Sequence, residues 1–124
     1  VKHIKKPDQI ITSPASRAFY TALFMADAWD IDENNLILND ALYHADRQTL
    51  LNIIRGADHP NILAICGHNP GLTLLINSFH AKGIDNLPTC GIMGFTFDIE
   101  NWRNLNSEHL MPNFYYTPRS IDKS

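Results

Sequence analysis

The sequence has few cysteines, no long apolar run and no strong excess of charge of either sign. Its two cysteines, Cys66 and Cys90, can form one disulfide at most and leave no spacing typical of a zinc site. Apolar stretches such as residues 62–66 are far shorter than the roughly 20 residues needed to cross a bilayer. The net charge of −3 argues against a nucleic-acid binder, which needs a basic face. We therefore expect a protein of a reducing compartment, by default the cytoplasm, with no nucleic-acid or membrane partner.

The amino terminus carries no targeting signal, and its first residue is not methionine. Val1-Lys2-His3-Ile4 has no apolar segment of the signal-peptide kind. The missing methionine indicates that upstream sequence has been lost. A length of 124 residues, with 44% hydrophobic and 19% charged residues, fits one globular domain over residues 1–124 and excludes a disordered or fibrous chain.

Strand-like and helix-like segments alternate along the chain. The expected order is strand 9–12, helix 15–29, strand 36–38, helix 46–55, strand 62–66, helix 72–81, strand 92–97 and strand 114–117. Residues 62–66 are apolar at every position, which is typical of a central parallel strand covered on both faces. The alternation predicts an α/β fold of three layers, in which a mostly parallel sheet has helices on both faces.

Two of the expected strand ends share one local pattern. Strand 9–12 runs into Ser13-Pro14, and strand 62–66 runs into Gly67-His68-Asn69-Pro70, each before a helix. Ser13 and Asn69 are expected at the N-caps, with each proline at the first helical position, where its missing N–H has no partner to lose. Both turns would then lie at the carboxyl ends of strands, where ligands bind in an open α/β sheet.

Arg17 and His68 follow these two strand ends and together predict an anion site. The first N–H groups of a helix are unpaired, and the helix dipole leaves roughly half a positive charge there. A cation in that turn, as Arg17 would be, is unfavourable unless an anion binds beside it, and a planar guanidinium suits phosphate. His68 could add a ring N–H to the same ligand. Arg17 could also be a solvated surface residue, and His68 could bond a neighbouring carbonyl, but the two signals together favour phosphate.

The residues of these turns resemble the histidine phosphatase superfamily. Ile11-Thr12-Ser13-Pro14-Ala15-Ser16-Arg17, followed by Thr21-Ala22, resembles its second motif, and Gly67-His68-Asn69-Pro70-Gly71 resembles its second-histidine motif. Leu87-Pro88-Thr89-Cys90-Gly91, the strand to Phe97, Trp102 and Leu105 are similar to the small SixA-type phosphohistidine phosphatases. The resemblance runs from Lys5 to about Leu105, and the Gly-His-Asn-Pro-Gly turn is its most specific part.

The resemblance implies a phosphoglycerate mutase-like fold and a metal-independent phosphatase. The phosphoryl group would pass from phosphohistidine on a protein to a histidine of the enzyme and then to water. Carried over by position, Arg17, His68 and Asn69 would bind phosphate, with Arg17 and His68 catalytic, because phosphoryl transfer depends on positioning and charge stabilisation. No metal or cofactor is implied, and the partner would be a phosphorylated protein or a small phosphorylated substrate. The sequence gives no indication of the oligomeric state.

The nucleophile motif of the superfamily is not found in the chain. That motif, Arg-His-Gly or Arg-His-Ala on a first strand, would precede Ser13, and His3 does not match it. We therefore expect the nucleophile and an N-terminal strand to lie upstream of Val1, which would leave this chain alone inactive. The alternative is a remnant that cannot catalyse. A deleted central strand would leave backbone groups unpaired in a buried sheet, which favours the first interpretation.

Asp40 and His44 are the candidates for the acid that protonates the leaving group. Both follow strand 36–38 closely, and each could also be a solvated loop residue. An imidazole leaving group, with a pKa of about 6.5, departs more readily than an alkoxide and needs such an acid less.

Two other functions stay open on the sequence alone. A noncatalytic phosphate-binding or regulatory module would keep Arg17 and His68 without a nucleophile. A small-molecule phosphomonoesterase would keep the chemistry but act on a different substrate. An upstream Arg-His-Gly or Arg-His-Ala strand distinguishes the phosphatase from the module, and activity on a phosphohistidine peptide against a simple phosphate ester distinguishes it from the esterase.

Overall fold

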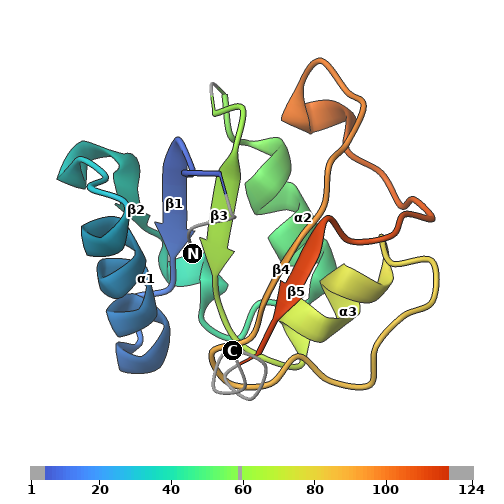
Figure 1. The fold of residues 1–124 in the computed structure, drawn as a ribbon, viewed down its shortest axis with the longest axis horizontal. Coiled ribbons are helices and arrows are strands. Elements are labelled where there is room, and N and C mark those ends of the chain that lie inside the picture. The colour runs from blue at the N-terminus through green and yellow to red at the C-terminus, as the bar shows by residue number, and fades with distance from the viewer. Residues whose placement is uncertain (1–4, 59, 118–124) are drawn as a thin grey trace.

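The computed structural model of the protein describes residues 5–58 and 60–117. Strands and helices alternate over most of this length (Figure 1), in the order β1 (Gln9–Thr12), α1 (Ser16–Ala28), β2 (Leu36–Leu38), α2 (Arg47–Arg55), β3 (Leu63–Cys66), α3 (Gly71–Asn77), β4 (Ile92–Gly94) and β5 (Phe114–Tyr116). Short 3-10 helices cover Glu33–Asn35, Asp40–Leu42 and Trp102–Asn104. Among the described residues, no helix is both long enough and apolar enough to span a membrane.

The strands form a three-stranded parallel sheet of order β2-β1-β3 and a separate antiparallel pair, β4-β5. Ile10 lies opposite Leu36 of β2 and Ala64 of β3, so β1 is the middle strand. The predicted α/β class is confirmed. Among the described strands, β3 lies at one edge of the parallel sheet, whereas the apolar run 62–66 predicts a central strand.

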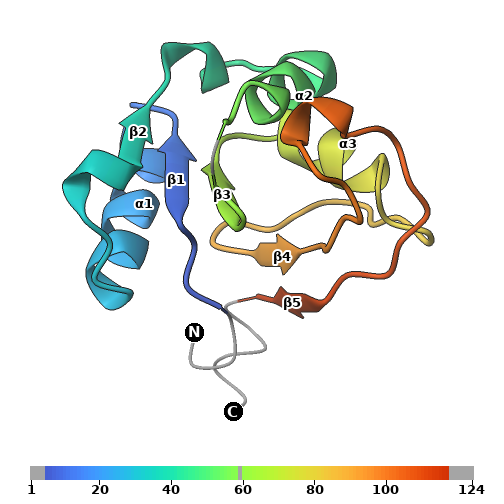
Figure 2. The same cartoon turned by 90° about the horizontal axis from the view of Figure 1, so that it is seen from above.

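Alternate residues of the parallel strands pack on opposite faces of the sheet. Ile10 and Cys66 belong to a buried cluster with Ala18 and Ala22 of α1. Ile11 belongs to a second cluster, to which α2, α3 and the loops beyond them contribute. Figure 2 accordingly shows α1 on one side of the sheet and α2 and α3 on the other. Cover on both faces explains the continuous apolar run of β3, although β3 is not central.

The ends of α2 lie where capping residues predict them. The Asp46 carboxylate accepts a hydrogen bond of 2.8 Å from the Thr49 backbone N–H, and this bond lowers the pKa of Asp46. Gly56 follows the last turn, and its N–H donates to the Asn52 carbonyl at 3.1 Å. The predicted helix 46–55 is confirmed, with Asp46 as its N-cap.

Two elements end three or more residues before their predicted ends. The predicted helix 72–81 ends at Asn77, whose side chain accepts from the Ile84 N–H at 2.8 Å and donates to the Ile84 carbonyl at 2.9 Å. These two hydrogen bonds hold the Asn77 side chain against the Ile84 backbone, so the chain leaves the helix after Asn77. The predicted strand 92–97 ends at Gly94, and Phe95 and Phe97 beyond it pack on the buried Phe79 ring, with ring centroids 5.8 and 4.8 Å from it.

Cys66 and Cys90 should differ sharply in reactivity. Cys66 is buried, its Sγ lies 3.9 Å from Met25 Sδ, and burial raises its pKa to about 12, whereas Cys90 is exposed. The thiolate is the reactive form, so a rise from 9.0 to about 12 leaves about a thousandfold less of it at pH 8. With an aromatic disulfide reagent we expect one thiol to react at once and the second only on unfolding. A fast phase that persists in Cys90→Ser would contradict this expectation.

Candidate functional site

The carboxyl ends of the three parallel strands form one rim of the sheet. The Ser13 N–H donates to the Cys66 carbonyl at 2.9 Å, so the ends of β1 and β3 are joined. On the other side, the Asn39 N–H donates to the Thr12 carbonyl, also at 2.9 Å. The residues that follow β1, β2 and β3 therefore meet at this rim, which is where open α/β sheets bind ligands.

Ser13 holds the ring of His68 at this rim. Ser13 Oγ and His68 Nε2 are 2.9 Å apart, and Ser13 Oγ also accepts from the Ala15 N–H at 3.2 Å. Ser13 is fully buried, so its hydroxyl hydrogen needs an acceptor, and within the described chain Nε2 is the one in reach. We assign the hydroxyl as the donor and Nε2 as the acceptor, which leaves the ring N–H at Nδ1. The hydroxyl is buried, so at this rim Ser13 holds the His68 ring and is not itself exposed to solvent.

The prediction that Ser13 caps the following helix is wrong. α1 begins at Ser16 with Ala15 at its N-cap, and no side chain caps it. Pro14 consequently lies before the helix rather than at its first position. The Ser13 hydroxyl is instead engaged by His68, which comes 55 residues later in the chain. Only the pairing of β1 with β3 brings the two together, and local sequence rules do not contain that information.

Asn69 uses its side chain to hold the start of α3. Its Oδ1 accepts from the Thr73 hydroxyl at 2.8 Å and from the Thr73 N–H at 3.2 Å, and its Nδ2 donates to the Leu87 carbonyl at 2.7 Å. α3 begins at Gly71 with Pro70 at its N-cap, so the predictions that Asn69 is the N-cap and Pro70 the first helical residue are both wrong. Both ends of the Asn69 amide have partners within the protein, and its role in phosphate binding stays a prediction.

Arg17 lies in the first turn of α1, as predicted, and is exposed. It is the second residue of the helix, four positions after Ser13, so it belongs to the same rim. That turn contains no acidic residue. The positive end of the helix dipole and a guanidinium are therefore combined there without a carboxylate from the same turn, which favours a bound anion.

The two candidate acids lie just after β2. Asp40 is exposed at the start of the 3-10 helix Asp40–Leu42, and His44 is exposed two residues beyond it. Tyr43, which the sequence did not single out, contacts both histidines: its ring centroid is 4.2 Å from that of His44 and 5.7 Å from that of His68. The structure thus places His44 near His68 through Tyr43.

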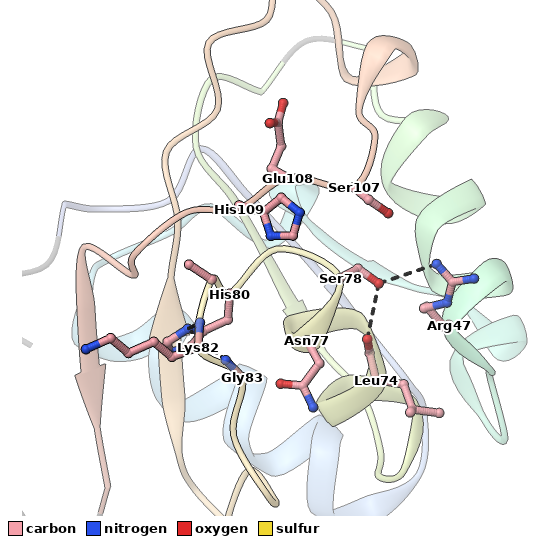
Figure 3. Close-up of a pocket in the computed structure, with 11 residues that line it drawn as sticks. Arg47, Leu74, Asn77, Ser78, His80, Lys82, Gly83, Ser107, Glu108 and His109 are labelled. Atoms are coloured by element: carbon pink, nitrogen blue, oxygen red, sulfur yellow. Dashed lines mark hydrogen bonds between the residues drawn. The ribbon is translucent and has the colours of Figure 1, made fainter.

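A separate hollow of about 550 Å³ lies at the other end of α3 (Figure 3). Arg47, His80, Lys82 and His109 are among its lining residues, and Arg47 Nη1 donates to Ser78 Oγ at 3.4 Å. The Glu108 carboxylate points away from its middle in this view. None of the predicted site residues lines this hollow. The cations there do not contribute to the rim.

Comparison with known proteins finds no match for the chain. No family model, no curated protein and no solved structure matches the chain. Within residues 5–58 and 60–117, no group of three or more histidine, cysteine, aspartate or glutamate side chains could hold a metal ion.

Proposed function

We propose that this chain belongs to a cytoplasmic, metal-independent phosphatase of the SixA type, which removes the phosphoryl group from phosphohistidine on a protein. One observation carries the proposal: Ser13 fixes His68 at the rim where the helix bearing Arg17 begins. Serine and arginine come from the first strand-to-helix unit and histidine from the third, and their strands β1 and β3 are neighbours in the sheet. The histidine phosphatase pattern of the sequence combines the same two units.

The chemistry of phosphoryl transfer suits this arrangement. The transferring group needs positioning and stabilisation of the charge on its oxygens more than covalent help. Arg17 would bind two of those oxygens with its planar fork, and the first N–H groups of α1 would face the same charge. With Nε2 engaged by Ser13, the Nδ1–H of His68 would be the donor toward the phosphoryl group.

The nucleophile would come from a strand outside these 124 residues. The Ile62 and Cys66 carbonyls accept from β1-side N–H groups, at 2.8 and 2.9 Å, so Leu63 and Ile65 direct their backbone groups to the other edge of β3. No strand of the described chain pairs with that edge, and β4 lies on this side of β3 (Figures 1 and 2). We propose that an upstream strand fills this edge in a phosphoglycerate mutase-like sheet and carries a histidine to the rim.

The reaction would then have two steps. The upstream histidine would attack phosphorus, forming one P–N bond while the P–N bond to the substrate imidazole breaks, and water would later hydrolyse the enzyme's own phosphohistidine. His44 or Asp40 would supply the proton to the leaving imidazole. The leaving imidazole needs little help from an acid, because its pKa of about 6.5 makes it a good leaving group.

The experiment that tests the proposal uses this chain joined to the upstream strand that the proposal requires. We expect hydrolysis of a phosphohistidine peptide without added metal, and a lower kcat/KM for a simple alkyl phosphate. His68→Ala should reduce kcat/KM by about 100-fold or more, since a charge-stabilising donor is worth that much in comparable sites.

Three outcomes would contradict parts of this proposal. Phosphate binding without turnover would favour the noncatalytic module. Equal rates on the peptide and the alkyl ester would favour the small-molecule phosphomonoesterase. A normal rate in His68→Ala would remove the site assignment.

A further inference from the structure

Tyr43 places an exposed aromatic ring directly beside His68. Its side chain is 52% exposed. Its ring meets the His68 ring edge-on, with an interplanar angle of 73°, and meets the His44 ring in the same way at 72°. The candidate phosphate site therefore has an aromatic wall on one side.

The segment that carries Tyr43 is held at three points. Its first residue, Asn39, bonds to β1 and accepts from the Ala41 N–H at 2.9 Å. Leu42, next to Tyr43, is fully buried in the core. The Ala45 carbonyl lies so close to Gly71 that a Cβ there would be 2.1 Å from its oxygen. The exposed ring is thus mounted on a fixed support, so little freedom is lost when a ligand stacks on it.

His44 adopts a backbone conformation that few residues take. Its φ is +66°, in the left-handed region, where a residue with a Cβ is uncommon and strained. Such strain is kept at positions that the surrounding structure holds in place, and these are often ligand sites. Here the left-handed turn coincides with the packing of the His44 ring against Tyr43.

We propose that Tyr43, supported by His44, forms a subsite for a planar aromatic leaving group. The phosphoryl group would lie between Arg17 and His68 while the ring that bears it stacks on Tyr43. This inference rests on the proposed function and assigns the residues that would hold its leaving group. An imidazole and a phenol share the required planar π-face, whereas a serine or sugar phosphate lacks one.

The test is equilibrium binding of two phosphonates to the 124-residue chain, measured by calorimetry. Phenylphosphonate and methylphosphonate carry the same anionic group, and we expect the phenyl compound to bind about 2- to 10-fold more tightly, as expected for one aromatic stacking contact. Tyr43→Ala should abolish this preference, so that the two phosphonates bind the variant with equal affinity. Tyr43→Phe should keep the preference. Titration with 1-phosphoimidazole and phenyl phosphate then distinguishes the imidazole from the phenol.

Tyr115→Ala is the matched control, because Tyr115 is an exposed tyrosine on β5 and its loss should leave the preference unchanged. Binding of inorganic phosphate with equal affinities for the two phosphonates would overturn the aromatic subsite and leave the proposed function standing. Failure of inorganic phosphate and both phosphonates to bind would overturn the subsite together with the phosphate site. A preference that survives in Tyr43→Ala would also overturn the subsite.

Discussion

Gly71→Ala is expected to destabilise the protein by about 3 kcal/mol and to lower its Tm by roughly 10 °C. A Cβ at this position would lie 2.1 Å from the Ala45 backbone oxygen and 3.2 Å from Leu50 Cδ1. Neither the start of α3 nor the segment before α2 can move without a large loss of stability. Leu42 anchors that segment in the core, and Leu50 anchors α2 there. The helix propensity of alanine, about 1 kcal/mol better than that of glycine, opposes this loss and is too small to offset it. Denaturant unfolding of both proteins measures the difference.

Gly56→Ala is the matched control for this prediction. Gly56 has φ −82°, a conformation any residue adopts, and a Cβ there would lie 3.5 Å from the nearest atoms, which is ordinary contact. We expect its stability to be unchanged or higher by up to about 1 kcal/mol, through a less flexible unfolded chain. Equal stability of Gly71→Ala and the natural protein would show that α3 and the segment after β2 are not in the close contact described.

The elements that the sequence predicts well are those whose ends are set by nearby residues. Asp46 caps α2 through Thr49, three residues away, and Gly56 ends it within the same turn. The strand Gln9–Thr12 is bounded by polar residues and by Ser13-Pro14. Such local signals also place Arg17 in the first turn of its helix. They act within a few residues, so they can be identified without knowing the fold.

The features that the sequence could not predict depend on contacts between distant segments. The hydrogen bond of Ser13 to His68 exists because β1 and β3 pair in one particular register, and a helix N-cap is the local alternative for the same serine. Tyr43 reaches His68 because β2 and β3 both pair with β1 and end at the same rim, an arrangement that no single segment encodes. The position of β3 at a sheet edge is likewise a property of the assembled strands, since its apolar run fits either position.

Arg17→Ala is expected to weaken the binding of inorganic phosphate to the chain by about 10- to 100-fold. Charge-assisted hydrogen bonds contribute about 1.5–3 kcal/mol each, and removal of the guanidinium removes at least one such bond. Arg17 is exposed and is not part of either core cluster, so the variant should fold normally. Titration of the 124-residue chain with phosphate, followed by calorimetry or by the NMR signals of His68, measures the change. The affinity of the natural protein should also fall as salt is added, because an exposed cation is screened.

Two control variants distinguish the planar hydrogen-bonding group of Arg17 from its positive charge. Lys82→Ala removes one positive charge at the hollow beyond the far end of α3, and phosphate affinity should stay within about twofold, since screening weakens exposed charges at that range. Arg17→Lys keeps the charge but loses the planar fork, so its affinity should fall between those of the natural protein and Arg17→Ala. If Lys82→Ala weakened binding as much as Arg17→Ala, the anion would be held by overall charge, and the rim would not be a phosphate site.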